Sequence, residues 1–516
     1  MTNGAFRKSL PVYFVGAGPG NPDLITLRGQ ALLRTADVIF HDTGLSSAFF
    51  QGCSEGCRVI DVGQVGIAPG EAIRNTAHQI IDAARQGQRV VRLKVGDPLF
   101  FSRALDELEA LRAAGIPVEV VPGVASPIGA AAFTGVPLTD VRGSQKLVFV
   151  AATDLLGNPV DGAEFAVLAK AADTLCVMLI GDQLHSIVNS LLKLERYREA
   201  RALLVRRATL PEQEVIEAPL AELGERCASK SSNEAGLLIL GDVLRHRKQL
   251  NWFESQPLFG KRLLLCRPSG QAADSANAIL HRGASSEVLP LIEIGPVGDD
   301  HALIECVDRV HCADWVIFTS ANGVEQFRRV VIASGKDARV FGCARLAVIG
   351  PGTAKPLAAW GLKPDLIAKE HVAEALARQI LDAGRVQSVM LIRALEARDA
   401  LPDTLRAAGV AVEIVPAYRT RKLGDAQREK LKHLLHARAI DAVLLTSSSM
   451  ADSLILALGV DAKDALARVC VASIGPITTA TLEKHGIMPT VTATTFTVDG
   501  LLDALEGYFT PKSSGD

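Results

Sequence analysis

The second half of the chain is internally duplicated. Five pairs of landmark residues recur there at a nearly constant offset of 125 to 127 positions: Arg267 and Arg393, Gly283 and Gly409, Pro290 and Pro416, Thr319 and Thr446, and Gly350 and Gly475. Each unit begins with a predicted strand, helix and strand. Two further strands follow, each with a helix after it; Thr-Ser lies between the first strand and its helix, and Gly-Pro lies between the second strand and its helix. This pattern predicts two similar α/β lobes that face each other across a cleft.

The strand-to-helix junctions of this half are candidate anion-binding positions. Both Thr-Ser pairs and both Gly-Pro pairs place hydroxyls and free backbone N–H groups at predicted helix N-termini. Because the duplication brings such groups in from both sides, a ligand with several carboxylates suits them better than a single phosphate. For any one serine or threonine, a role as a simple helix N-cap remains an open alternative.

The whole chain alternates short β-branched runs that end in glycine or proline with Ala/Leu-rich helical patterns. This alternation predicts an α/β fold with mainly parallel sheets. At about 150 residues per domain, the length of 516 residues corresponds to roughly 3.4 domains, which excludes a single core. A polar and aromatic segment with one proline predicts a linker over residues 248–259.

Composition excludes several classes of function. The net charge of -2 offers no general basic field for nucleic acid. Nine cysteines without paired spacing predict free thiols and no metal site, as in a cytoplasmic protein. The longest uncharged stretch, Val120–Thr139, contains three prolines and three glycines, so no membrane span is expected. The amino-terminal segment does not resemble a signal peptide.

Three glycine turns follow predicted strands in the first half. The segment GAGPG at Gly16–Gly20 precedes Asp23, which we expect to be the N-cap of the next helix. It is not a dinucleotide fingerprint, because Asn21 stands where the pattern GxGxxG needs glycine. Further turns lie at Gly96–Asp97 and Gly123. One such turn is weak evidence, but three at strand ends predict the ligand edge of an open sheet.

Four segments of the first half carry a family resemblance: VYFVGAGPGNPDLITLRGQALLRTADVIFHD, VVRLKVGDP, AGIPVEVVPGVASPIGAAAFTGVPLT and LILGDVLRHRKQLNWF. Over about residues 10–253 they resemble the uroporphyrinogen-III C-methyltransferases. The resemblance implies a two-lobed tetrapyrrole-methylase fold over residues 10–247, with lobes of about 10–138 and 139–247. It also implies a homodimer formed through this half, with S-adenosylmethionine bound between the lobes.

The same resemblance assigns site residues. It implies S-adenosylmethionine contacts at Gly18, Pro19, Gly96, Asp97, Ala125, Ser126 and Ile180. It implies a role in methyl transfer for Asp42, since methylation of a pyrrole carbon requires later removal of a ring proton. Arg103 corresponds to a family arginine, and a guanidinium can bind a substrate carboxylate through two hydrogen bonds.

Four departures from the family pattern fall on this site. Gln64 replaces a lysine proposed as a proton donor, and Asp140 replaces a histidine. Val95 stands in place of a glycine, and its β-branched side chain disfavours a positive φ. Ile180 stands in place of a methionine that contacts the cofactor. This half is therefore either an active methyltransferase with an altered site or a degenerate domain with a structural or regulatory role.

Six segments of the second half carry another resemblance: GKRLLLCRP, DWVIFTSANGVEQF, AVIGPGTA, VPAYRT, LLTSSSMADSL and SIGPITTATLEKHG. In this order they resemble uroporphyrinogen-III synthase over about residues 260–508. The resemblance implies one lobe from residues 260–290 and 422–508, and a second from 297–415. Crossover strands are expected near 290–297 and 414–421, and a disordered tail over 509–516.

The synthase family closes linear hydroxymethylbilane into uroporphyrinogen III with inversion of ring D, without a metal or cofactor. The resemblance implies that Ser320, Asn322, Thr353, Ser447 and Thr478 bind the substrate. Tyr418 corresponds to the family tyrosine proposed to assist departure of the hydroxyl, and packing between the lobes is an equal alternative for it. Helix N-termini provide neutral donors for the substrate carboxylates without an arginine cluster.

The leading hypothesis is a fused enzyme whose second half makes uroporphyrinogen III and whose first half methylates it twice to precorrin-2. The alternative is a uroporphyrinogen-III synthase that carries a degenerate methyltransferase domain. A nicotinamide oxidoreductase is poorly supported, because GxGxxG is absent. The sequence leaves open the later pathway branch and any channelling between the halves.

Overall fold

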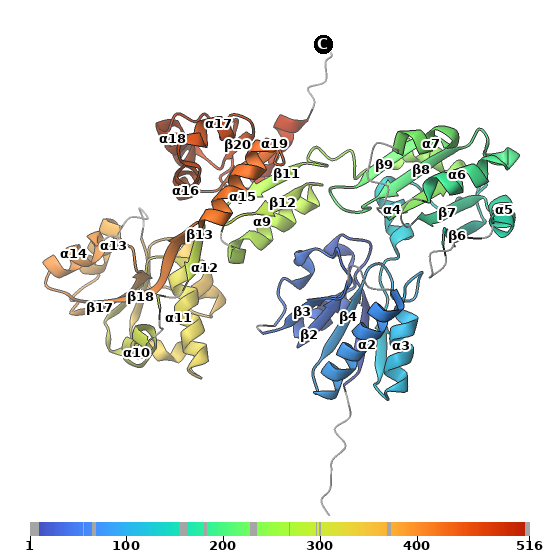
Figure 1. Ribbon diagram of the computed structural model, residues 1–516. Coiled ribbons are helices and arrows are strands. Elements are labelled where there is room, and N and C mark those ends of the chain that lie inside the picture. Colours follow the sequence, from blue (N-terminus) through green and yellow to red (C-terminus); the bar gives the residue numbers. More distant parts are fainter. Residues whose placement is uncertain are drawn as a thin grey trace, which may run out of the picture.

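The computed structural model describes residues 10–54, 56–63, 69–153, 160, 162–179, 183–227, 235–267, 269–295, 297–298, 301–368, 373–397 and 399–510. Four β-sheets with covering helices divide this part of the chain into four lobes (Figure 1). Each sheet contains five or six strands. No helix within the described ranges is both long and apolar enough to span a membrane.

The first lobe contains a parallel sheet in the order β3-β2-β4-β1-β5. Its elements are β1 (Val12–Gly16), α1 (Leu27–Thr35), β2 (Val38–His41), β3 (Arg58–Asp61), α2 (Pro69–Arg85), β4 (Val90–Lys94), α3 (Ala104–Ala113) and β5 (Val118–Val121). The strands are short because a glycine turn or a polar loop follows them. The carboxyl ends of β1, β4 and β5 therefore meet at one edge, as the three glycine turns predict.

The expected N-cap at Asp23 is wrong. Asn21 caps a short 3-10 turn, Pro22–Leu24, by accepting a hydrogen bond from the Asp23 backbone N–H. Thr26 then caps α1 by accepting from the Gly29 N–H. Pro22 provides a fixed φ for the first position of the 3-10 turn, so Asp23 lies inside that turn. The α-helix α1 begins later.

The second lobe contains a mixed sheet in the order β6-β7-β10-β8-β9. Its elements are α4 (Ser126–Thr134), β6 (Leu147–Ala151), α5 (Gly162–Ala171), β7 (Thr174–Leu179), α6 (Leu184–Leu192), β8 (Arg201–Arg206), β9 (Glu214–Pro219), α7 (Leu220–Cys227) and β10 (Gly236–Leu240). Only β6 and β7 pair in parallel, whereas the other three pairings are antiparallel. The expectation of mainly parallel sheets is wrong for this lobe, because β8 and β9 are joined by a short hairpin instead of a crossover helix.

The third lobe combines both ends of the second half. Its sheet order is β12-β11-β19-β20-β21, and all pairings are parallel. Its elements are β11 (Arg262–Leu265), α9 (Ser269–His281), β12 (Ser285–Val288), α15 (Asp425–His436), β19 (Ala442–Leu445), α16 (Ser448–Leu458), α17 (Ala462–Leu466), β20 (Cys470–Ser473), α18 (Pro476–Lys484), β21 (Val491–Thr492) and α19 (Val498–Phe509).

The fourth lobe has the sheet order β13-β18-β17-β14-β15-β16. Its elements are β13 (Ile292–Gly295), α10 (His301–Arg309), β14 (Trp315–Phe318), α11 (Ala321–Ala333), β15 (Arg345–Val348), α12 (Pro351–Ala359), β16 (Leu366–Ile367), α13 (Ala373–Asp382), β17 (Ser388–Ala394), α14 (Ala400–Ala407) and β18 (Ala411–Lys422). Strand β13 pairs with β18 in antiparallel orientation, and both continue toward the third lobe (Figure 1).

The two lobes of the second half repeat one topology. The order β12-β11-β19-β20-β21 corresponds strand by strand to β18-β17-β14-β15-β16, and these pairings are parallel in both sheets. The internal duplication predicted from the landmark offsets is confirmed. Phe509 belongs to α19, so the expectation that the disordered tail starts at residue 509 is wrong; the rest of that prediction, residues 511–516, lies outside the described residues.

The segment expected as a linker is packed against both halves. Phe253 is buried and its ring contacts Phe133 of α4 and Phe259, with centroids 4.8 and 5.2 Å apart. Trp252 donates a hydrogen bond to the Ala132 carbonyl at 3.0 Å. Leu258 is fully buried in a core cluster of the third lobe. The connection between the halves is therefore an apolar contact instead of a solvated tether.

Candidate functional site

The three glycine turns of the first lobe meet at one point. Gly18 and Gly96 form an antiparallel bridge, with N–H to carbonyl distances of 3.1 and 2.8 Å. A Cβ on Gly16 would lie 2.6 Å from the Gly123 Cα, and a Cβ on Gly123 would lie 2.3 Å from the Gly96 carbonyl oxygen. Only glycine permits three backbones to approach this closely. The turns thus form the single sheet edge predicted from the sequence.

Most of the residues expected to bind S-adenosylmethionine surround this point. The Asp97 carboxylate accepts hydrogen bonds from the Leu99 N–H at 2.8 Å and the Gly123 N–H at 3.0 Å, which ties the second turn to the third. A Cβ on Gly96 would lie 3.1 Å from the Ser126 Oγ. Ala125 is the N-cap residue of α4, directly before Ser126.

The ring of Pro19 packs against α4, since a Cβ on Gly129 would lie 2.4 Å from its Cγ. Together with Gly18 it belongs to the first glycine turn and adjoins the residues above. Ile180, the remaining expected contact, lies outside the described residues, as does Gln64.

Asp42, expected to take part in methyl transfer, belongs to a buried charge network. Its Oδ1 accepts a hydrogen bond from Arg92 Nη2 at 2.6 Å, and its Oδ2 accepts one from the Val95 N–H at 3.0 Å. Arg92 also donates to both carboxylate oxygens of Glu107 on α3, at 2.7 and 2.9 Å. Lys94 Nζ lies 3.5 Å from Asp42 and 3.6 Å from Glu107. Two cations on one strand therefore bridge two carboxylates from different elements.

This network sets the charge of its members. Burial opposes ionisation of Asp42, but the charges of Arg92 and Lys94 and the Val95 N–H lower its pKa below the ordinary value. Burial and the charge of Arg92 lower the pKa of Lys94. At neutral pH Asp42 is therefore a carboxylate, and its low basicity suits electrostatic stabilisation better than strong general-base catalysis.

The structure accommodates Val95 and Asp140, two of the residues that depart from the family pattern. Val95 does not have a positive φ, because Gly96 takes that conformation at +69°. Asp140 accepts hydrogen bonds from Arg142 at 2.9 Å and lies 3.0 Å from His246 Nε2. The hydrogen bonds from Arg142 are the largest cause of a strongly lowered pKa for Asp140. The structure agrees with the expectation that Val95 avoids a positive φ, and its side chain is exposed at this edge.

Arg103 is the N-cap residue of α3, the helix that carries Glu107. It therefore lies one helical turn before Glu107, whose ion pairs with Arg92 and Lys94 connect α3 to β4.

In the second half, the structure places Tyr418 of β18 next to Ser320. Their hydroxyl oxygens are 2.9 Å apart. Ser320 is the N-cap of α11 and accepts a hydrogen bond from the Gly323 N–H. The Tyr418 ring is buried in the core cluster of the fourth lobe. The ring of Tyr418 therefore packs inside the fourth lobe and not between the lobes, while its hydroxyl contacts Ser320 at the candidate site.

Ser447 occupies the matching position of the third lobe. It is the N-cap of α16 and accepts from the Met450 N–H at 3.2 Å. The N-cap interpretation is therefore confirmed for both serines. Their hydroxyls still lie at the carboxyl edges of β14 and β19, which correspond in the two sheets.

The remaining expected residues lie in the first turns of three helices. Asn322 is partly buried in α11. Thr353 of α12 and Thr478 of α18 are 5% and 3% exposed. The two threonines thus occupy equivalent positions but face the protein interior, whereas the serines are more accessible.

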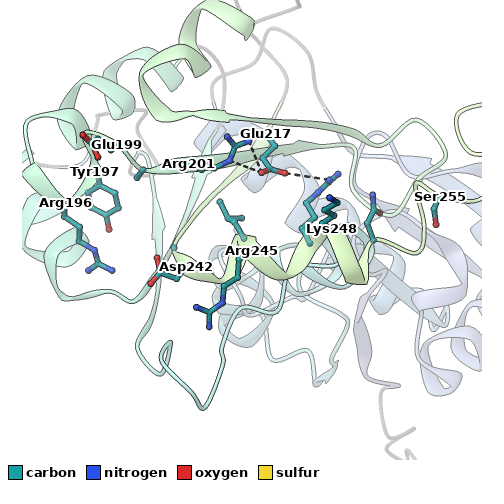
Figure 2. A pocket seen from close by; sticks show the side chains of 14 residues that line it. Arg196, Tyr197, Glu199, Arg201, Glu217, Asp242, Arg245, Lys248 and Ser255 are labelled. Carbon is teal, nitrogen blue, oxygen red and sulfur yellow. Dashed lines mark hydrogen bonds and ion pairs between the residues drawn. The ribbon is translucent and has the colours of Figure 1, made fainter.

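A groove of about 1030 Å³ lies in the second lobe, away from these residues (Figure 2). Arg201 and Arg247 both approach Glu217 there, at 3.0 and 3.9 Å, and Arg247 also pairs with Glu254 at 2.6 Å. None of the site residues predicted from the sequence lines this groove. The groove is lined by five cationic side chains and three carboxylates, and several of these form ion pairs with one another or with neighbouring residues, so the groove does not by itself indicate a ligand.

Comparison with known proteins decides the family of each half. Residues 11–224 match the family of tetrapyrrole (corrin/porphyrin) methylases, and residues 273–503 match uroporphyrinogen-III synthase HemD. The chain joins a tetrapyrrole-methylase domain to a uroporphyrinogen-III-synthase domain. The family resemblances found in the sequence are confirmed, as is the two-part α/β architecture.

Individual relatives agree with these domains. A porphyrin biosynthesis protein HemD from Ruminiclostridium josui is 28% identical over 96% of this chain and 97% of that protein. A siroheme synthase from Stutzerimonas stutzeri is 36% identical over 48% of this chain, and the chain spans about half (53%) of that protein. A Thermus thermophilus uroporphyrin-III C-methyl transferase, solved with S-adenyl homocysteine, is 31% identical over 46% of this chain and 99% of that one, with a TM-score of 0.39.

Sequence reasoning missed the charge network of the methylase domain. Arg92, Lys94 and Glu107 all contact one another or Asp42, yet only Asp42 was singled out. The signal was present in VVRLK, where two cations two residues apart interrupt an otherwise apolar strand. Charges facing one side of a buried strand require buried partners.

Proposed function

We propose that the chain is a bifunctional enzyme of tetrapyrrole biosynthesis. The synthase domain converts hydroxymethylbilane to uroporphyrinogen III with inversion of ring D, and the methylase domain transfers two methyl groups to that product to give precorrin-2. The contact of Tyr418 with Ser320 at the carboxyl edge of a duplicated sheet is the observation that carries the synthase proposal.

In the synthase domain, Tyr418 is the proton donor for the leaving hydroxide of the substrate. Its hydroxyl hydrogen transfers to that oxygen as the carbon–oxygen bond breaks, and water leaves. Ser320 holds the phenol in place, since its Oγ lies 2.9 Å away and is itself fixed by the Gly323 N–H. Helix N-termini at Ser320 and Ser447 offer partial positive charge to the substrate carboxylates.

Incubation of the full chain with hydroxymethylbilane tests the synthase activity. We expect the type III isomer after oxidation and chromatographic separation, and Tyr418→Phe should lower kcat at least tenfold without changing the circular dichroism spectrum. Exclusive recovery of the type I isomer, which forms without an enzyme, would contradict the proposal.

In the methylase domain, the residues around the three glycine turns fit S-adenosylmethionine. Gly18, Pro19, Gly96, Ala125 and Ser126 would hold it, because they adjoin one sheet edge where glycines permit close approach. When bound, it supplies the methyl group. Asp42 offers a fixed negative charge beside this edge, and Arg103, the N-cap residue of α3, would bind a substrate carboxylate.

One observation favours the alternative of a degenerate methylase domain. Both oxygens of Asp42 already accept hydrogen bonds, and its lowered pKa makes it a poor proton acceptor. Calorimetric titration with S-adenosylhomocysteine separates the two cases. Micromolar binding together with transfer of label from S-adenosylmethionine to uroporphyrinogen III supports an active enzyme, whereas no binding supports the degenerate domain.

A further inference from the structure

We propose that Arg267 and Arg393 bind carboxylates of the tetrapyrrole substrate, one from each lobe of the synthase domain. This inference rests on the proposed synthase function and extends it. It replaces the expectation that neutral helix N-termini alone hold the substrate.

The duplication places the two arginines at equivalent positions. Arg267 lies two residues beyond the end of β11, and Arg393 is the penultimate residue of β17. Strand β11 pairs in parallel with β19, and β17 pairs in parallel with β14. The carboxyl ends of parallel strands meet at the same sheet edge. Each arginine therefore shares an edge with a serine N-cap, Ser447 in one lobe and Ser320 in the other.

Arg267 has a neutral partner where a carboxylate is expected. Its Nη1 donates a hydrogen bond to the hydroxyl of Ser275, a buried residue of α9, at 3.0 Å. Its Nε is buried and makes no hydrogen bond in the structure. No Asp or Glu in the described part of the chain forms an ion pair with it. Arg267 is partly buried and its guanidinium stays protonated, so an anion would offset the desolvation of the buried Nε.

Arg393 is only 7% exposed, and its Nη2 donates to Asp399 Oδ1 at 2.6 Å. That carboxylate precedes α14, and its side chain is 63% exposed. An exposed carboxylate is an exchangeable partner, because water can solvate it when a second anion takes its place. Asp399 is thus one partner of Arg393 that a ligand carboxylate can displace or join.

The chemistry of both sites fits an organic polycarboxylate. A guanidinium binds a carboxylate through two parallel hydrogen bonds, which fixes direction as well as charge. Hydroxymethylbilane carries acetate and propionate groups around its length, so one arginine on each lobe can bind carboxylates of different rings. Such a pair of anchors orients the chain ends for closure, whereas partial charges at helix N-termini alone would bind with less direction.

Arg267→Met and Arg393→Met test the proposal, with Arg339→Met as the control. Arg339 is highly exposed, pairs with Asp337 and lies in the segment before β15, at the amino-terminal edge of the sheet. Two readouts are needed: the KM for hydroxymethylbilane, and the affinity for uroporphyrin III measured by fluorescence titration of the full chain. We expect each variant to raise KM and Kd at least tenfold and to change kcat less than threefold. Lysine at either position should restore only part of the loss, and the control should match wild type.

Unchanged KM and Kd in folded Arg267→Met and Arg393→Met would overturn the proposal. Should Arg393→Met fail to fold, the less buried Arg267→Met and the charge-conserving Arg393→Lys decide between binding and structural roles. A purely structural arginine would alter the unfolding temperature but leave both readouts unchanged. If wild-type protein yields only the type I isomer, the synthase function fails, while the porphyrin titration still reports separately on the arginines.

Discussion

At the scale of single residues, the methylase domain depends on a closed network of four charges. Arg92 is 3% exposed and contacts both Asp42 and Glu107, and Lys94 approaches the same two carboxylates. Buried ion pairs of this kind add little stability over an apolar replacement, but removal of one member leaves an uncompensated charge. The network is therefore sensitive to single substitutions and more tolerant of paired ones.

We expect Arg92→Met to destabilise the methylase domain by about 3–5 kcal/mol, because Glu107 would remain buried without its main partner. Hydrogen exchange of β4 peptides, read by mass spectrometry, measures this locally in the full chain. The double variant Arg92→Met/Glu107→Met should recover most of the loss. If the double variant is as unstable as the single one, loss of packing and not of charge pairing is the cause.

The network also predicts a dependence on pH. The pKa of Asp42 is lower in the folded chain than the ordinary value of about 3.9. Its ion pairs therefore stabilise the fold fully above that value and lose their effect as pH falls through the folded pKa. The stability difference between wild type and Asp42→Asn, from urea unfolding, should be constant from pH 7 to 5 and shrink below about pH 4. A difference that grows on acidification would contradict this assignment.

At the scale of elements, the sequence predicted those turns in which two backbone segments approach so closely that only glycine fits. Gly16, Gly96 and Gly123 all follow strands, and the structure brings them together. The pairing of β8 with β9 was not predictable in the same way, because the direction of a strand is set by its connection and not by its composition. Likewise Thr353 and Thr478 match family motifs, but the sequence did not indicate that both are buried.

The glycine junction gives a prediction at this scale. We expect Gly123→Ala to destabilise the first lobe by about 1–3 kcal/mol, since its Cβ would lie 2.3 Å from the Gly96 carbonyl oxygen. Affinity for S-adenosylhomocysteine should fall with it, as measured by calorimetry. Gly143→Ala is the matched control, because its Cβ meets no atom within 4 Å. Equal affinities in the two variants would show that the junction does not form the cofactor site.

At the scale of the whole molecule, the duplication was predictable from the sequence. The five pairs of landmark residues recur because the two lobes share one topology, which requires the same residues at the same junctions. Sheet orders in the third and fourth lobes correspond strand by strand. The contact between the halves was not predictable, since apolar residues in a short polar segment are equally typical of a solvated linker. His281 Nε2 also lies 2.8 Å from Asp23 Oδ2, which adds a polar contact between the synthase and methylase domains.

We expect Phe253→Ala to loosen the connection between the domains. Truncation of a buried phenylalanine costs about 3–5 kcal/mol, and here it removes the ring that contacts both Phe133 and Phe259. Limited proteolysis should then cut within residues 248–259 much faster than in wild type. Gln249→Ala, at an exposed position of the same segment, is the control. Wild-type resistance in Phe253→Ala would show that this ring does not secure the segment.

The central claim is that one chain carries out two consecutive steps on a tetrapyrrole. Its most direct test is incubation of the purified full chain with hydroxymethylbilane and S-adenosylmethionine labelled with carbon-13 in the methyl group, followed by NMR of the product. The account predicts a type III macrocycle that carries two labelled methyl groups. A type I macrocycle, or a type III macrocycle without label, would contradict it.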